Sequence, residues 1–114
     1  MKILWVENHQ AFTRMAVKQF LFTHAVKIVP SLVAARLAIL SEDFDAVIMD
    51  YDLDDGKGAE LVAELRGRGN KIKIIAASSH EKGNALLVAA GADAVCSKMK
   101  FESIAQVLGT LVGA

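Results

Sequence analysis

The sequence has one cysteine, few aromatic residues and no excess of charge of either sign. Because there is only one cysteine, Cys96, the chain has no internal disulfide and no zinc site built on cysteines. Cys96 lies inside an apolar run, so we expect it to be a small buried side chain. Aromatic residues make up 6% of the chain against 54% for all hydrophobic residues, which predicts an aliphatic core. The 13 basic and 13 acidic residues cancel and form no basic stripe, which argues against direct binding of nucleic acid.

The sequence also lacks a long apolar run. No uninterrupted stretch approaches the roughly 20 apolar residues of a membrane-spanning helix. The four apolar residues between Lys2 and Glu7 are too few for the apolar core of a signal peptide. We therefore expect no membrane association and a cytoplasmic location. A length of 114 residues suits one domain, over 1–114, with a single core.

Strand-like and helix-like segments alternate five times along the chain. The predicted strands are 2–7, 26–29, 45–50, 72–77 and 94–97, and the predicted helices are 9–22, 31–40, 58–66, 81–90 and 101–112. Continuous apolar strands separated by helices indicate a parallel sheet that is covered on both faces. Right-handed crossovers then make the sheet doubly wound. The predicted fold class is therefore α/β.

Local signals mark the ends and faces of several helices. Ser31 is a candidate N-cap, and Gly91 and the run Gly67–Asn70 are candidate helix ends. Inward-facing apolar residues are predicted on three helices: Phe12, Met15, Ala16 and Phe20 on the first, Leu61, Val62 and Leu65 on the third, and Ile104, Val107, Leu108 and Leu111 on the last.

Four predicted strands end at, or just before, polar residues of different kinds: Asn8, Asp50, Ser78 and Lys98. A parallel sheet gathers such residues at its carboxyl edge, where open α/β folds bind ligands. A carboxylate, a polar cation ligand, a hydroxyl and an ammonium group together suit phosphoryl chemistry.

Each of these residues also has a simpler structural interpretation. Asp50 fits a strand-end turn, and Asn8 fits the N-cap of the first helix. Ser78 with Glu81 fits the capping box S-x-x-E of the fourth helix, and Lys98 fits an exposed strand-end lysine. In the loop after Asp50, two acids are expected to be solvated charges: Asp54 and Asp55.

On four matching positions the sequence resembles the receiver domain of bacterial two-component response regulators, the family of the chemotaxis regulator CheY. The matches are Asp50, Gly58 eight residues later, Ser78 and Lys98, and the resemblance covers the whole chain from Lys2 to the last helix. It implies a flavodoxin-like sheet of five parallel strands in the order 2-1-3-4-5. It also implies that a histidine kinase or phosphotransfer protein phosphorylates Asp50, and that a surface then switches toward a downstream protein. Such a protein is a signalling phosphoacceptor, with at most self-catalysed phosphorylation and dephosphorylation, and not an enzyme.

The resemblance assigns a role to each residue of the pocket. Lys98 acts as a point charge on the phosphoryl oxygens, and the Ser78 hydroxyl moves toward the phosphoryl group. Asp52 and His80 tune the lifetime of the acyl phosphate. The implied cofactor is Mg²⁺, which takes oxygen ligands. The implied metal ligands are Glu7, Asn8, Asp50 and the main-chain carbonyl of Asp52.

The acidic pocket departs from the family pattern. Most receivers have two adjacent acids after the first strand, whereas this chain has Glu7 and Asn8, which predicts weaker Mg²⁺ binding. Asp54 replaces the proline usually found four residues after the acceptor. Met99 replaces the proline that usually follows the lysine; a cis bond there would cost about 2.5–4 kcal/mol, so a trans peptide is expected.

A further departure concerns signal output. Many receivers have Tyr or Phe three residues before the lysine, and the rotation of that ring reports the phosphoryl state. This chain has Val95, so a switch would depend on Ser78 and on movement of the loop that follows it.

Two alternatives remain open at the level of the sequence. The first is a pseudo-receiver of the same fold that is not phosphorylated and acts as a protein-interaction or dimerisation module. The second is a flavodoxin-like enzyme or flavin carrier, which would need a phosphate-binding loop after the first strand; the segment from Glu7 to Phe12 offers none, and the chain has no G-x-G-x-x-G motif. The receiver is favoured, with a homodimer possible.

Overall fold

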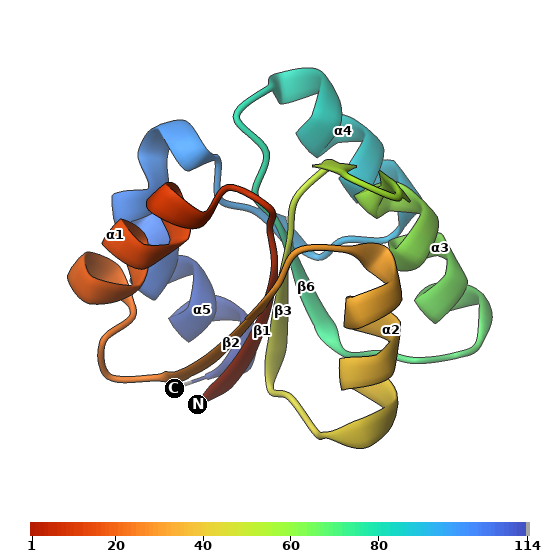
Figure 1. Cartoon of the computed structure of the whole chain (residues 1–114), viewed down its shortest axis with the longest axis horizontal. Helices are drawn as coiled ribbons and strands as arrows, with labels where there is room; N and C mark the ends of the chain where they lie inside the picture. Colours follow the sequence, from red (N-terminus) through yellow and green to blue (C-terminus); the bar gives the residue numbers. More distant parts are fainter. Residues whose placement is uncertain (114) are drawn as a thin grey trace.

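The most apolar runs of the chain form a parallel sheet of five strands, in the order β2-β1-β3-β6-β7. We describe it from a computed structural model that covers residues 1–113 (Figure 1). The sheet strands are β1 (Lys2–Val6), β2 (Ala25–Val29), β3 (Ala46–Met49), β6 (Lys73–Ala76) and β7 (Ala94–Val95). All four residues of β3 are buried, as continuous apolar patterning predicts for a central parallel strand. Numbered along the predicted strands, this order is 2-1-3-4-5, and the predicted fold is confirmed.

Helices cover both faces of the sheet (Figure 1). The helices are α1 (Gln10–Phe20), α2 (Leu32–Ser41), α3 (Gly58–Gly67), α4 (Glu81–Ala90) and α5 (Ile104–Val112), with a 3₁₀ segment, η1 (Lys98–Ser103), before α5. Helices α1 and α5 lie on one face, and α2, α3 and α4 lie on the other. Each face has its own cluster of buried apolar side chains. Within residues 1–113 no helix is long and apolar enough to cross a membrane.

The few aromatic residues are concentrated on one face of an otherwise aliphatic core. Trp5 of β1 is fully buried and stacks on Phe101, with ring centroids 4.9 Å apart. The edge of Phe12 meets Trp5 at 5.8 Å, and Phe20 contacts Phe101 at 6.2 Å. Aromatic pairs in these geometries add about 0.5–1.5 kcal/mol each beyond their buried area. The cluster therefore fastens β1, α1 and η1 to one another.

Most of the local signals are confirmed. The hydroxyl of Ser31 accepts a hydrogen bond from the N–H of Ala34, as an N-cap should, and Gly91 ends α4 with a φ of 128°. The predicted inward faces of α3 and α5 pack into the core. Met15 is an exception, since it is 40% exposed. Thr13 is buried on that helix, and its hydroxyl donates to the carbonyl of Gln10, which satisfies it.

Two segments differ from the predicted elements. The loop after β3 contains a short antiparallel hairpin, β4 (Asp52–Leu53) with β5 (Gly56–Lys57). The sequence did not predict it, because strands of two residues are too short to show an alternating apolar pattern. The predicted helix over 101–112 starts inside the 3₁₀ segment η1 and becomes α-helical only at Ile104; a residue with a non-helical backbone conformation, Lys100, lies within η1 just before the predicted start.

At the amino edge of the sheet, one carboxylate joins two strands to a helix. Glu42, which follows α2, forms an ion pair with Lys2 of β1 at 2.8 Å and another with Lys27 of β2. Hydrogen bonds from these two ammonium groups lower the pKa of Glu42 from 4.5 to about 2.

We predict that Glu42 makes part of the stability depend on pH. A carboxylate whose pKa is lower in the folded than in the unfolded state stabilises the fold above pH 4.5, and this contribution is lost as the pH falls toward 2. Glu42→Gln should therefore be less stable than the wild type at pH 6 and equal to it near pH 2, as measured by urea unfolding across this range. Asp43→Asn, at an exposed neighbouring carboxylate, is the control. A constant difference between wild type and Glu42→Gln at every pH would contradict the assignment.

Candidate functional site

Asp50 lies at the carboxyl end of β3, in the middle of the sheet edge. Its N–H donates to the carbonyl of Val6, which continues the pairing of β3 with β1. The side chain is buried, with a residue exposure of 5%. Oδ1 accepts a hydrogen bond from the N–H of Tyr51 at 2.8 Å, and Oδ2 lies 3.1 Å from the ammonium nitrogen of Lys98.

Gly58 lets the chain fold back against this strand end. A Cβ at position 58 would lie 1.9 Å from the carbonyl oxygen of Asp50, too close for any other residue. The N–H of Gly58 donates to the carbonyl of Tyr51 at 2.6 Å and so closes the loop that contains β4 and β5. The sequence match at Gly58 thus has a steric cause.

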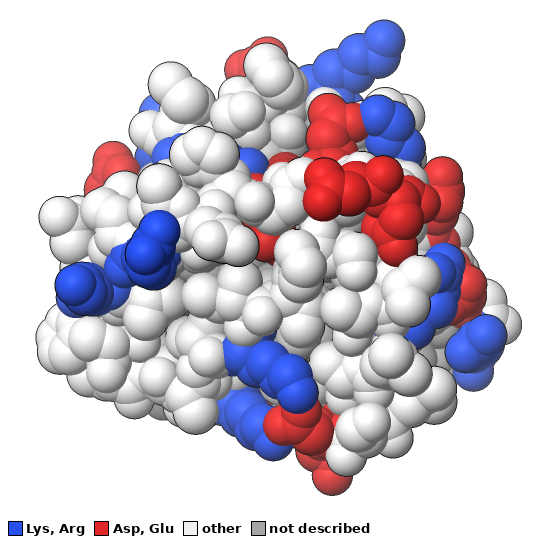
Figure 2. All heavy atoms as spheres, in the orientation of Figure 1, with Lys and Arg blue, Asp and Glu red and all other residues white. Residues whose placement is uncertain are grey.

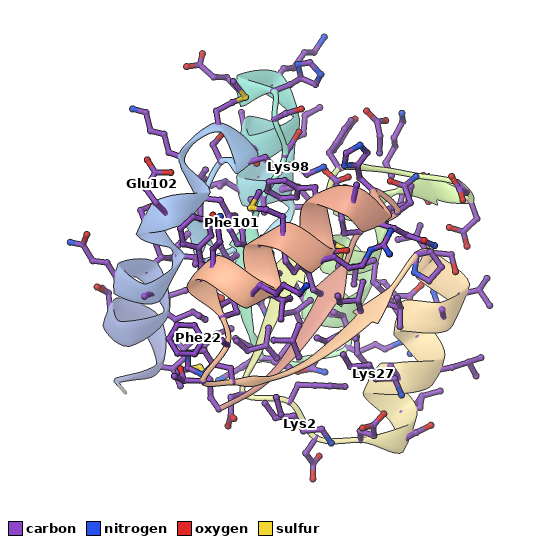
Figure 3. All side chains as sticks on the ribbon, turned by 60° about the vertical axis from the view of Figure 1, so that its left-hand side comes forward. Lys2, Phe22, Lys27, Lys98, Phe101 and Glu102 are labelled. Atoms are coloured by element: carbon purple, nitrogen blue, oxygen red, sulfur yellow. The ribbon has the colours of Figure 1, made fainter. Side chains whose placement is uncertain are left out.

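Lys98 brings its ammonium group between two buried carboxylates. Its Nζ lies 2.6 Å from Oε1 of Glu7, which is 1% exposed, and 3.1 Å from Oδ2 of Asp50. In Figure 3, Lys98 lies beside the first turn of α1, and its ammonium is 5.9 Å from the ring centroid of Phe12. The structure contains no cis peptide within residues 1–113, so the expected trans bond before Met99 is confirmed. Lys98 reaches Asp50 without the family's proline.

The electrostatics of Glu7 follow from its burial. Loss of solvent raises the pKa of the Glu7 carboxyl above its ordinary value, the Lys98 ammonium opposes that rise, and the negative charge of Asp50 adds to it. The other carboxylate oxygen, Oε2, accepts from the N–H of His9 at 3.1 Å.

Asn8 makes a contact that the sequence does not predict. Its amide nitrogen donates to Oδ1 of Asp54 at 2.9 Å, which joins the loop after β1 to the hairpin turn after β3. The N-cap of α1 is His9 and has no side-chain capping bond, so the interpretation of Asn8 as the cap is wrong. With its nitrogen directed to Asp54, the amide leaves its oxygen free to bind a cation.

Ser78 lies two residues beyond the end of β6, the neighbouring strand. It is 4% exposed, and its hydroxyl accepts from the N–H of His80 at 3.1 Å. The N-cap of α4 is His80, without a side-chain capping bond, so the predicted capping box with Glu81 is wrong. A residue that the sequence did not single out, Asn84 of α4, hydrogen-bonds the main chain of Ser78. A lone Asn in a helix carries no signal of such a contact.

The hairpin turn concentrates acidic groups on one side of the pocket. Figure 2 shows acidic side chains gathered at the upper right, over β4 and β5. The two acids expected to be solvated are both exposed, and Asp54 is directed toward the pocket rim through Asn8. Asp55 also accepts from the N–H groups of Leu32 and Val33 at the start of α2, and these bonds lower its pKa. The expectation of exposed loop charges is confirmed, and the contact of Asp55 with α2 is an addition that the sequence did not predict.

The donors of this pocket suit a hard cation that keeps much of its water shell. Among residues 1–113 no group of three His, Cys, Asp or Glu side chains forms a ready metal cage. However, Oε1 of Glu7 is buried, and apart from the ammonium of Lys98 at 2.6 Å it has no polar partner among residues 1–113. Carboxylate, amide and carbonyl oxygens are what Mg²⁺ binds, and it needs few of them from the protein. The residues present therefore fit Mg²⁺.

Comparison with known proteins gives a consistent picture. A family model described as the response regulator receiver domain matches residues 3–108. The fold is similar to the receiver domain of the sensor histidine kinase PA1611 from Pseudomonas aeruginosa, solved with magnesium in its active-site cleft (21% identity, 99% of this chain, 98% of that chain, TM-score 0.83). It is also similar to the response regulator TrrA from Thermotoga maritima in complex with Mg²⁺-BeF (20% identity, 96% of this chain, 97% of that chain, TM-score 0.85). No curated protein matches the sequence.

We predict that Lys98 stabilises the folded pocket. Lys98→Met would leave Glu7 and Asp50 as two buried carboxylates without a counter-charge, which should lower the free energy of unfolding at pH 7 by about 3–5 kcal/mol. The loss should shrink as the pH falls, because burial raises the pKa of the Glu7 carboxyl and its protonation removes one of the two negative charges. Urea unfolding measures both. The variant Lys98→Met/Glu7→Gln should recover much of the loss, and a single variant as stable as the wild type at pH 7 would show that the pairing contributes nothing.

Proposed function

Because the chain belongs to the response regulator receiver domain family, we propose that it accepts a phosphoryl group on Asp50 and relays that modification to a protein partner. The observation that carries the proposal is the pocket itself. The Asp50 carboxylate, the Lys98 ammonium and the buried Glu7 carboxylate converge at the carboxyl edge of the sheet.

The chemistry needs a nucleophile and compensation of charge. An Asp50 oxygen attacks the phosphorus of the donor and forms an acyl phosphate, and the bond between phosphorus and the donor's leaving group breaks. Lys98 already contacts Asp50, so its ammonium is placed to balance charge on the transferred group. Water later attacks the phosphorus and releases inorganic phosphate together with the free Asp50 carboxylate. In these two steps the protein is itself modified and then dephosphorylated, and no separate substrate is converted repeatedly. We therefore propose that it is a signalling phosphoacceptor and not an enzyme.

The oxygens proposed to hold Mg²⁺ come from two loops. Asp50, the Asn8 amide oxygen and the Asp52 main-chain carbonyl would bind it, with Glu7 behind them. When bound, Mg²⁺ neutralises negative charge on phosphoryl oxygens. Asp54 has a supporting role, because its carboxylate fixes the Asn8 amide with the oxygen free and adds the negative charge that an Asn at position 8 lacks.

Partners and location are proposed from the same reasoning. A histidine kinase or a phosphotransfer protein would supply the phosphoryl group, and a downstream protein would bind the switched surface. We also propose a cytoplasmic location, on the basis of the family to which the chain belongs.

One observation favours the alternative of a pseudo-receiver. Lys98 is in contact with both Glu7 and Asp50, so the pocket has an internal cation that already balances part of its charge. A domain of this kind would bind partners without phosphorylation.

We predict that the protein gains the mass of a single phosphoryl group when incubated with acetyl phosphate and Mg²⁺. Intact mass spectrometry measures the gain. Asp50→Asn and removal of Mg²⁺ with a chelator should each abolish it. Absence of any gain in the wild type, with the protein folded and Mg²⁺ in excess, would overturn the proposed phosphorylation and favour the pseudo-receiver.

We also predict that Asp54 supports Mg²⁺ binding. Asp54→Asn should weaken the affinity for Mg²⁺ by about tenfold, a loss within the range caused by removing a group that orients a metal ligand. Isothermal titration calorimetry measures it without phosphorylation. Asp55→Asn is the matched control, because it removes the same charge from the next residue, and the amide oxygen can still accept one of the two hydrogen bonds from α2. Equal losses in the two variants would show that only the overall charge of the loop matters.

A further inference from the structure

The segment between β6 and α4 is short, and the helix begins against the pocket. Strand β6 ends at Ala76 and α4 begins at Glu81, so the first turn of the helix lies beside Ser78. Within this turn Asn84 is 6% exposed, and its side chain is directed back toward the strand end.

The amide of Asn84 pairs with both main-chain groups of Ser78. The N–H of Ser78 donates to Oδ1 of Asn84 at 2.8 Å, and Nδ2 of Asn84 donates to the carbonyl of Ser78 at 3.0 Å. Both hydrogen bonds are buried. A carboxylate here could accept the first bond but could not donate the second, and an apolar side chain could make neither. With an apolar side chain at position 84, the buried N–H of Ser78 would lose this partner, which is unfavourable in a buried site.

Gly83 brings the helix equally close to the Ser78 side chain. A Cβ at position 83 would lie 2.8 Å from the hydroxyl oxygen of Ser78 and 3.1 Å from Cβ of Tyr51. The helix backbone therefore lies directly against the hydroxyl and against the residue that follows Asp50. The first turn of α4 and the strand end are packed as one unit.

The carbonyl of Ser78 also binds the segment that contains Lys98. The hydroxyl of Ser97 and the N–H of Lys98 both donate to the carbonyl of Ser78, each at 3.3 Å. Ser78 is thus the point at which β6, α4 and the start of η1 meet. By contrast, Val95, the position of the family's reporting aromatic, is 44% exposed and has a short side chain.

We propose that Asn84 is a positioning residue that locks the main chain of Ser78 to α4, so that a shift of Ser78 toward a phosphoryl group on Asp50 displaces the helix. This inference rests on the proposed function and identifies α4 as the helix that responds to phosphorylation. Helix α4 exposes Leu86 and Val88, so a displacement of the helix changes an apolar surface that a partner can read. The amide pair takes the place of an aromatic rotation at Val95.

Hydrogen exchange of the full chain, followed by NMR with and without Mg²⁺ and beryllofluoride, tests this inference. Beryllofluoride serves as a stable phosphoryl mimic, and ¹⁹F NMR reports whether it is bound. In the wild type we expect the mimic to change the exchange rates of α4 amides by about fivefold or more, which corresponds to a coupling of about 1 kcal/mol. In Asn84→Asp, which keeps the acceptor but loses the donor, we expect less than about a twofold change at α4 while the mimic still binds.

Two further variants make the result specific. Asn70→Asp makes the same substitution after α3, where the Asn70 side chain also accepts from a main-chain N–H, and it should respond like the wild type. Asn84→Ala removes both bonds without adding charge and should lose the α4 response; it replaces Asn84→Asp if that variant does not fold.

The outcomes separate this inference from the proposed function. Bound mimic with unchanged α4 exchange in the wild type, or a full α4 response in the folded Asn84 variants, would overturn the coupling and leave the phosphoacceptor intact. Absence of bound mimic, together with absence of phosphoryl gain, would overturn the proposed function and the coupling with it.

Discussion

The arrangement of the pocket depends on the contact of one ammonium group with two buried carboxylates. Glu7 directly follows β1 and Asp50 directly follows β3, and these strands are neighbours, so the parallel sheet forces the two acids together. Two carboxylates in a poorly solvated site repel each other, and burial alone raises the pKa of Glu7. Lys98 compensates both, and it can do so because the fifth strand of the sheet delivers η1 to the same edge. The fold therefore places the charged groups of the proposed chemistry in one ion triplet of Glu7, Lys98 and Asp50.

The fold could be predicted from the sequence because it depends on patterns that repeat along the chain. Apolar runs such as the buried residues of β3 specify strands wherever they occur, and signals such as Ser31 and Gly91 act within a few residues. The positions of Asp50, Ser78 and Lys98 followed from the sheet, since every strand end lies at the same edge. What these residues do chemically remains a prediction that the geometry supports.

The contacts that could not be predicted join residues far apart in the chain. Asn8 and Asp54 are separated by 46 positions, and neither carries a local signal for the other. The capping interpretations of Asn8 and Ser78 failed for different reasons. The amide of Asn8 is directed to Asp54, so a tertiary contact decided its partner. The hydroxyl of Ser78 accepts from the N–H of His80, the residue just before α4, so its partner is local but lies one position short of the helix.

The aromatic cluster below the pocket gives the protein an intrinsic optical probe. Trp5 is the only tryptophan of the chain, and it is fully buried against Phe101, three residues after the lysine that contacts Asp50. Its indole N–H makes no hydrogen bond within residues 1–113, so its emission is set by the rings around it and not by solvent. Any movement of η1 that follows Lys98 would change the overlap of the two rings. The intrinsic fluorescence of Trp5 can therefore report changes at Asp50 without an added label.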